Sequence, residues 1–279
     1  MIERFEYISP SGLTMPLLSN DYFNLIEISG FTLAQSDIAS VTVPFVDGDT
    51  PTNVQAKART VTLYLKLKQA AGVETAKRYI MQFVKLKKEG VIQLEQDGRK
   101  TELVGIVESI DLPRFQAGCV MAVTLHCSQP YWRDIDYVVK QISAYNNLHH
   151  FAISFPSAGI PFGVYDIDQT QDFENTGDVD TGVIITVIAL DTVVNPKIIN
   201  THTGKFIGVN DTLYANESVE ISTIKGHKTI TKDGENIIDK IMSGSTFLQL
   251  SAGLNEFTIE ADSGVNDLYF TLVYKQLYV

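Results

Sequence analysis

The sequence has little of what secreted or membrane proteins need. Two cysteines, Cys119 and Cys127, do not make a disulfide framework, and the first residues carry acids where a signal peptide has an apolar segment. The longest apolar runs, such as Gly182–Leu190, fall short of the roughly 20 residues that span a bilayer. We therefore expect a protein that folds in a reducing cytoplasm and has no membrane partner.

Basic residues are also scarce, and they are unequally distributed between the two parts of the chain. The chain of 279 residues has a net charge of −11. Residues 1–134 hold 14 Lys and Arg against 15 Asp and Glu, whereas residues 135–279 hold 8 against 18. The acidic half would repel phosphate backbones, and no basic cluster with interleaved aromatics stands out elsewhere, so nucleic-acid binding is not expected. The change in charge favours two domains, over 1–134 and 171–279.

What the first part does contain is strand patterning. Arg59–Gln69 alternates, with Val61, Leu63, Leu65 and Leu67 on one face, which is typical of a half-buried strand. Similar but weaker signals predict the following strands: Leu25–Leu33, Ser40–Val46, Val91–Glu95, Glu102–Leu112 and Ala117–Cys127.

One segment of the first part has the period of a helix. Val73–Glu89 places its apolar residues on one stripe, and Gly90 follows as a stop signal. Its cations are Lys77, Arg78, Lys85, Lys87 and Lys88, and the last three would lie in the final turn. This basic face is either a solvated surface or a contact with an acidic neighbouring subunit.

The second part is predicted to be entirely β. Residues 135–170, with prolines and glycines among aromatics, are predicted to form a connecting arm. Eight short strands then follow at regular spacing: Thr181–Ala189, Pro196–Asn200, Lys205–Gly208, Glu217–Ser222, Lys228–Thr231, Thr246–Leu250, Asn255–Glu260 and Leu268–Tyr274. We predict a mainly β (β-rich α+β) protein. Its N-terminal domain is β-sandwich-like with one amphipathic helix, and its C-terminal domain is an antiparallel β-sandwich of the jelly-roll or galectin type.

The stretch "LHCSQPYW" (125–132) is the strongest candidate for chemistry. Because successive side chains of a strand point to opposite faces, Cys127 is expected in the core with His126 facing away, which excludes a catalytic pair between them. Both thiols are predicted to be free and buried. Trp132, the single tryptophan, is predicted to anchor the end of the first domain.

No other constellation predicts catalytic, metal or cofactor-binding residues. Asp166, Asp168 and Asp172 resemble half of a calcium loop but lack its glycine and its glutamate. The histidines lack the spacing of a zinc site, and phosphate-binding and nucleophile motifs are missing. The sequence therefore indicates no enzyme, no metal and no cofactor.

Several stretches together resemble the distal tail protein (Dit) family of long-tailed bacteriophages, in its two-domain form. They are "NLIEISGF" (24–31), "VPFVDGDT" (43–50), "KARTVTLYLKL" (57–67), "AKRYIMQFV" (76–84), "LHCSQPYW", "FENTGDVDTGVIITV" (173–187), "IINTHTGKFIGVN" (198–210) and "SAGLNEFTIEADSGVNDLYFTLVYKQLY" (251–278). Their order and spacing cover most of the chain.

The resemblance implies a structural hub in the phage tail tip, or baseplate, made in the bacterial host cytoplasm from a phage or prophage genome. It implies a homo-hexameric ring that joins the tail tube protein to the tip protein and to receptor-binding or baseplate proteins. The alternative is a carbohydrate-binding module for host cell-wall saccharides, although the second part lacks both tryptophan and arginine. A ring needs head-to-tail contacts, and a hairpin around Phe31–Arg59 would suit β-pairing between neighbours.

Overall fold

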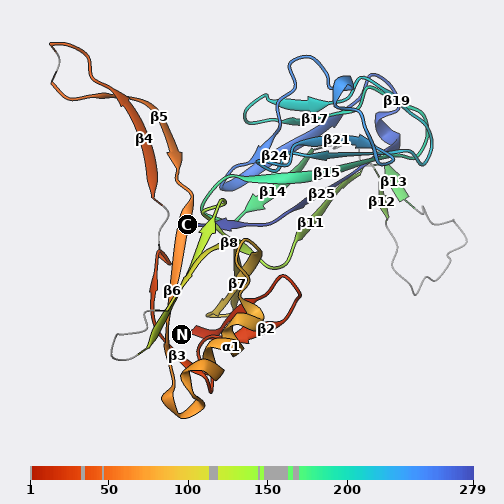
Figure 1. Cartoon of the computed structure of the whole chain (residues 1–279). Coiled ribbons are helices and arrows are strands. Elements are labelled where there is room, and N and C mark those ends of the chain that lie inside the picture. Colours follow the sequence, from red (N-terminus) through yellow and green to blue (C-terminus); the bar gives the residue numbers. More distant parts are fainter. Residues whose placement is uncertain are drawn as a thin grey trace, which may run out of the picture. The chain divides into compact units, whose positions relative to one another are not determined.

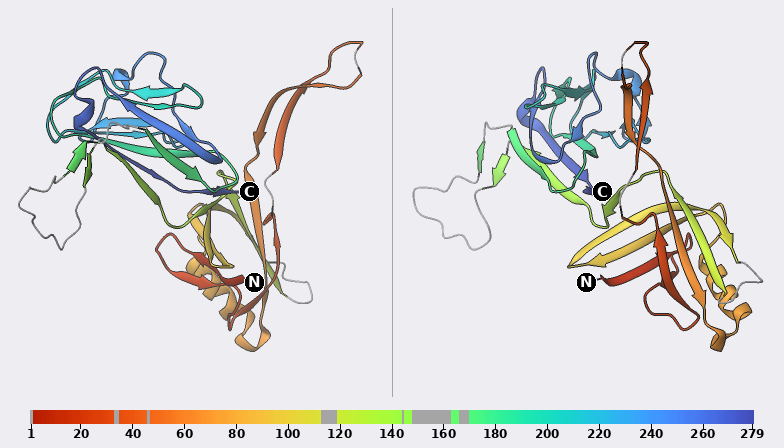
Figure 2. Two further views of the ribbon diagram at one scale, coloured as in Figure 1. Left: turned by 180° about the vertical axis from the view of Figure 1, so that it is seen from behind. Right: turned by 90° about the vertical axis from the view of Figure 1, so that its left-hand side faces the viewer.

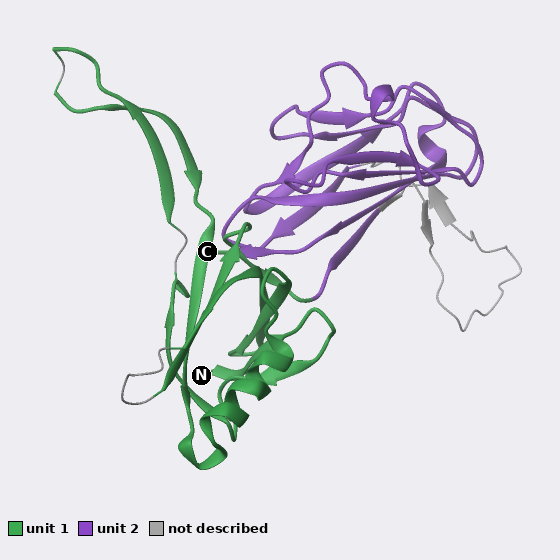
Figure 3. Ribbon diagram, viewed as in Figure 1, with its two compact units in different colours: residues 1–135, 278–279 green, residues 136–277 purple. Residues whose placement is uncertain are grey.

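A computed structural model describes residues 2–32, 35–45, 47–112, 119–143, 145–147, 163–165 and 170–279 (Figure 1). The chain forms two compact units, one of residues 1–135 with 278–279 and one of residues 136–277 (Figure 3). The predicted mainly β fold with one α-helix is confirmed. No helix in the described ranges is long and apolar enough to cross a membrane.

Unit 1 is built on one antiparallel sheet, visible from two sides in Figure 2. Its strand order is β2-β1-β7-β8-β9-β6-β3. The bounds are β1 Ile2–Ile8, β2 Thr14–Pro16, β3 Phe23–Ser29, β6 Arg59–Leu67, β7 Glu89–Gln96, β8 Arg99–Asp111 and β9 Val120–Cys127. The short β10 (Trp132–Asp134) pairs with β8 and with β26 (Leu277–Tyr278). The sequence predicts no strand between Cys127 and residue 135, so β10 is an element that sequence reasoning missed.

The helix α1 (Val73–Phe83) covers one face of this sheet after a short 3₁₀ turn, η1 (Gln69–Ala71). Its buried residues Ala76, Ile80 and Phe83 join the core formed by the inward face of β6. The helix ends six residues earlier than predicted, because the chain turns extended at Val84 and Glu89 already starts β7. Lys85, Lys87 and Lys88 therefore lie in the turn after the helix.

Gly90 is a strand residue and not a helix stop. It lies in β7, where a Cβ atom would come within 2.1 Å of the Tyr7 hydroxyl oxygen. The missing side chain thus makes room for the buried Tyr7 ring. The sequence does not distinguish a glycine that makes room for a neighbouring side chain from a glycine that ends a helix.

Unit 2 is a two-sheet sandwich, as the sequence predicts. One sheet has the order β11-β25-β15-β20-β21-β22, and the other has the order β14-β24-β17-β18. The bounds are β11 Val138–Ser143, β14 Thr170–Asn175, β15 Thr181–Ala189, β17 Lys197–Asn200, β18 Phe206–Gly208, β20 Ser218–Ser222, β21 Thr229–Lys232, β22 Glu235–Asn236, β24 Gly253–Glu260 and β25 Leu268–Tyr274. Alternate residues of β15 and β25 and the Phe173–Phe257 ring pair fill the core between the sheets.

Minor elements complete this unit. They are the two-stranded pairs β12 (Tyr145–Asn147) with β13 (Gly163–Tyr165) and β16 (Val193–Val194) with β19 (Thr212–Leu213), the strand β23 (Gln249–Leu250), and the 3₁₀ turns η2 (Ile238–Lys240) and η3 (Val265–Asp267).

Part of the predicted arm, 135–170, belongs to the sandwich. Val138–Ser143 pairs in register with Tyr274–Tyr269 of β25, so this part is the edge strand β11. The sequence gives no hint of it because the pairing is with residues about 130 positions further along the chain. Residues 144, 148–162 and 166–169 of the arm lie outside the described residues.

Candidate functional site

The most unusual surface of unit 1 is a β-hairpin that pairs with no other strand among the described residues. Its strands are β4 (Ser36–Val41) and β5 (Thr50–Ala56), and every residue of both strands is exposed. Figures 1 and 3 show the hairpin extending away from the sheet of unit 1. A two-stranded hairpin exposed on both faces is marginally stable in water by itself.

One face of this hairpin, called its apolar face below, is centred on an exposed apolar pair and also holds the Ser36–Ala56 pair. Ile38 stands directly opposite Val54, and their side chains remain 60% and 62% exposed. The neighbouring pairs Asp37 with Gln55 and Ala39 with Asn53 point to the other face. At the tip, Phe45 is fully exposed and adopts a positive φ of 67°. An apolar face of this kind is typical of a surface that another molecule covers.

The base of the hairpin, by contrast, is fixed in the core. The Phe31 ring packs edge-to-face against Phe5 and Trp132, with centroid distances of 5.6 and 5.2 Å. The Phe31 carbonyl accepts hydrogen bonds from Arg59 Nη1 at 3.1 Å and Trp132 Nε1 at 3.5 Å. Gly30 approaches the backbone so closely that a Cβ atom would lie 2.0 Å from the Thr60 carbonyl oxygen. The base of the hairpin is thus tied to the core of unit 1.

Arg59 is a buried cation at this base. Its Nε and Nη2 have no hydrogen-bond partner among the described residues, and burial lowers the pKa of its guanidinium. The side chain packs beside Cys127, its cross-strand neighbour. We assign Arg59 to fixing the hairpin through the Phe31 carbonyl.

The candidate pair in "LHCSQPYW" is separated, as predicted. Cys127 is fully buried and His126 is exposed on the opposite face of β9. Burial, partly offset by the charge of Arg59, raises the pKa of the Cys127 thiol to about 11, so the thiol is protonated at neutral pH.

Cys119 is a free thiol but is only half-buried, so the prediction that it is buried was wrong. The residue lies before β9 and has a φ of 39°, so it does not take part in the alternation of that strand.

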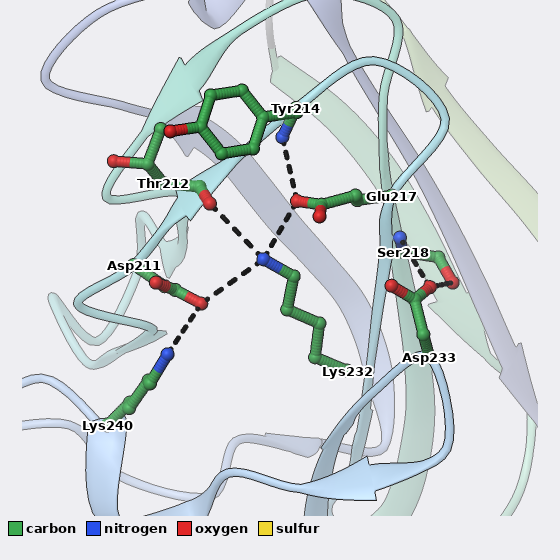
Figure 4. A network of polar contacts seen from close by, with 8 residues as sticks. All are labelled: Asp211, Thr212, Tyr214, Glu217, Ser218, Lys232, Asp233 and Lys240. Carbon is green, nitrogen blue, oxygen red and sulfur yellow. Dashed lines mark hydrogen bonds and ion pairs between the residues drawn. The ribbon is translucent and has the colours of Figure 1, made fainter.

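A network of polar contacts in unit 2 surrounds Lys232 (Figure 4). Its Nζ lies 2.8 Å from Glu217 Oε2 and 3.4 Å from Asp211 Oδ2, and Lys240 Nζ lies 3.0 Å from the same Asp211 oxygen. Burial alone would raise the pKa of Asp211, but Lys240 and Lys232 outweigh it and lower that pKa. The hydrogen bond from Lys232 likewise lowers the pKa of Glu217. Two cations on two carboxylates neutralise one another, so this cluster joins loops and offers no catalytic group.

The remaining candidate residues from the sequence do not form a metal or sugar site among the described residues. Of the calcium-like residues, Asp166 and Asp168 lie outside the described residues, and Asp172 lies on β14 opposite Glu256 of β24. These two carboxylates line a shallow polar hollow with Thr170 and Gln171, and no described residue of this lining carries an aromatic ring on which a sugar could stack. No group of three or more metal-ligating side chains occurs in the described ranges.

Reasoning from the sequence therefore located the hairpin but not the residues that matter in it. Ile38, Val54 and Phe45 sit among Asp, Ser, Thr and Pro, and such a pattern does not separate an exposed apolar face from a buried one. The signal that could have found them is the acidic turn "DGD" (47–49) with apolar residues on both sides.

Comparisons with known proteins agree with this picture. Residues 176–278 match the family model of the siphovirus-type tail component, C-terminal domain. The structure resembles the SPP1 Dit (gp 19.1) protein, described as a paradigm of the hub of the adsorption apparatus in phages that infect Gram-positive bacteria, with a TM-score of 0.69, 14% identity and coverage of 99% of both chains. It also resembles a chain of the phage P2 baseplate in its activated conformation with Ca, with a TM-score of 0.51, 9% identity and coverage of 99% and 98%.

No curated protein matches the sequence significantly. At these identities the structural likeness shows the fold alone, and it extends over both units. The family match adds the sequence evidence for the sandwich. The resemblance to the distal tail protein family is thereby confirmed: residues 176–278 match the C-terminal domain of the siphovirus-type tail component family, and both units have the fold of the SPP1 Dit protein.

Proposed function

We propose that this protein is a structural hub of a phage tail tip, where copies of the chain form a closed ring. The observation that carries the proposal is the β4–β5 hairpin, whose apolar face no described part of the chain covers. A second copy is the natural cover, because edge strands and exposed apolar residues together favour β-pairing between subunits. The family match of the second unit supports the tail as the place of assembly.

In this proposal the protein has no catalytic role. The thiol of Cys127 is buried and protonated, and the Lys232 cluster is internally neutralised. The ring is a homo-hexamer that connects the tail tube protein with the tip protein and with receptor-binding or baseplate proteins. Its location is the tail tip of the virion.

The test is the mass of the purified full chain in solution, measured by light scattering. We expect about six times the chain mass of 30.9 kDa. Replacing both Ile38 and Val54 by Ser should shift the mass toward one chain, because it removes the apolar face without touching a buried core. The matched control is Leu254→Ser, an equally exposed apolar residue of β24.

A ring that persists in the hairpin variant would exclude the hairpin as the contact. A chain that stays monomeric at every concentration would contradict the proposal itself.

A further inference from the structure

Two exposed patches of unit 1 have opposite charge. The first is the acidic tip of the hairpin, formed by Val43, Phe45, Asp47 and Asp49. Residues 36–56 contain three aspartates and no Lys or Arg. Asp49 accepts a hydrogen bond from Ser40, and no cation pairs with Asp47 or Asp49 in the described part of the chain. The tip thus combines a fully exposed aromatic ring with unneutralised carboxylates.

The second patch is the basic turn between α1 and β7, formed by Lys85, Leu86, Lys87 and Lys88. All four residues are exposed, and Leu86 is an apolar side chain among three ammonium groups. Lys85 Nζ donates to the Met81 carbonyl, and no described carboxylate forms an ion pair with any of the three lysines. By comparison, Lys77 and Arg78 of the helix lie within 4 Å of Glu74.

The basic turn is held rigidly by the sheet. Lys87 N donates to the Val107 carbonyl at 3.0 Å, and Val107 N donates to the Lys88 carbonyl at 3.0 Å. These bonds continue the ladder of β8 beyond β7 and fix the turn, which includes a positive φ of 61° at Lys87. A prearranged surface loses little conformational freedom on binding.

The two patches cannot meet within one chain, because α1 and its following turn lie against the sheet whereas the hairpin extends away from it (Figure 3). Two complementary patches at different places on one subunit define a head-to-tail contact, which closes into a ring when the rotation permits. We propose that the acidic tip of one copy docks on the basic turn of the next copy, with Phe45 against Leu86 and the aspartates against the lysines. This inference rests on the proposed ring and specifies its contact.

The experiment is a charge reversal in the full chain, with self-association measured by sedimentation. One variant carries Asp47→Lys and Asp49→Lys, a second carries Lys87→Glu and Lys88→Glu, and a third combines all four changes. Each pair of reversals should weaken association about tenfold, because it replaces attraction by repulsion at two exposed ion pairs. The combined variant should regain most of that loss, because the complementary charges are exchanged. Glu235→Lys with Asp239→Lys, two exposed acids of unit 2, is the matched control and should change nothing.

Raising the salt from 0.1 to 1 M should weaken the wild-type contact, since the screening length falls from about 10 to about 3 Å. If the wild-type ring forms and neither reversal affects it, this docking is wrong while the proposed hub stands. If only the turn reversal matters, or if the combined variant is no better than the single pairs, the turn binds another partner and the inference also fails. A wild-type chain that never associates would overturn both proposals.

Discussion

At the scale of single residues, the aromatic junction around Trp132 links the end of the first unit to the start of the hairpin. Trp132 is 6% exposed and contacts Phe31 through both its ring and its Nε1. The predicted burial of this side chain is therefore confirmed. One residue thereby stabilises the core and holds the hairpin base.

Replacing Trp132 by Ala should destabilise unit 1 by about 3–5 kcal/mol, because it empties a large buried volume. Trp132→Phe should cost clearly less, since an aromatic ring still packs against Phe31. Urea unfolding followed by circular dichroism measures both variants. Equal stability of the Ala variant and the wild type would contradict the packing described above.

At the scale of elements, ionic contacts connect the strand β21 to loops that flank its neighbours. Lys232 at the end of β21 ties β21 to the loop before β19 through Asp211, and to the residue before β20 through Glu217. Burial alone would lower the pKa of Lys232, but Glu217 and Asp211 outweigh it and raise that pKa. The folded carboxyl groups are more acidic, and the folded amine more basic, than in the unfolded chain.

The sign of these shifts predicts the pH range of the stabilisation. Carboxyl groups with a depressed folded pKa stabilise above their unfolded values of about 4, and this contribution is lost as the pH falls through the folded pKa. A raised Lys232 pKa stabilises below about 10.4, and that contribution is lost as the pH rises through the folded pKa. The cluster is therefore strongest between these limits.

We expect Lys232→Met to lower the unfolding temperature of unit 2 at neutral pH and to flatten its decline in acid. The fluorescence of Trp132, the single tryptophan, reports unit 1 and should show an unchanged transition in this variant. Calorimetry at pH 3, 5 and 7 gives the comparison. An unaltered pH dependence would mean that Lys232 does not control the two carboxyl groups.

At the scale of the whole molecule, the chain passes from unit 1 to unit 2 and then returns. Tyr278 belongs to unit 1, where it is 7% exposed and its hydroxyl lies 3.1 Å from Asp134 Oδ2. The Arg99 guanidinium stacks 4.3 Å from the centre of its ring. The first unit is thus completed by residues that follow the sandwich in the sequence.

Tyr278→Ala should therefore destabilise unit 1, although the substitution lies at the far end of the chain. We expect a loss of about 3 kcal/mol, read from the Trp132 fluorescence during urea unfolding. Tyr278→Phe keeps the ring and loses only the hydroxyl contact, at about 1 kcal/mol. If the Ala variant left the tryptophan transition in place, the return of the chain would have no energetic role.

Local periodicity was enough for much of this fold. The period-two pattern of Thr181–Ala189 and Leu268–Tyr274 predicted β15 and β25 with their full lengths, and strand alternation separated Cys127 from His126. These features depend only on the order of neighbouring residues, so they can be read from the sequence. The absence of known catalytic and metal-binding motifs could also be read from the sequence alone.

What only the tertiary structure decided depends on residues far apart in the chain. The helix ends at Phe83 because Glu89–Gln96 pairs with both β1 and β8, and Val138–Ser143 is a strand because β25 offers it an edge. Tyr278 completes a core more than 140 residues away in sequence, and Ile38 and Val54 stay exposed because no other described strand pairs with their hairpin. The periodicity of the side chains predicts which residues share a face of a strand or helix. Whether that face is buried, and how much free energy its burial contributes, depends on the segment of the folded chain, or of another copy, that packs against it.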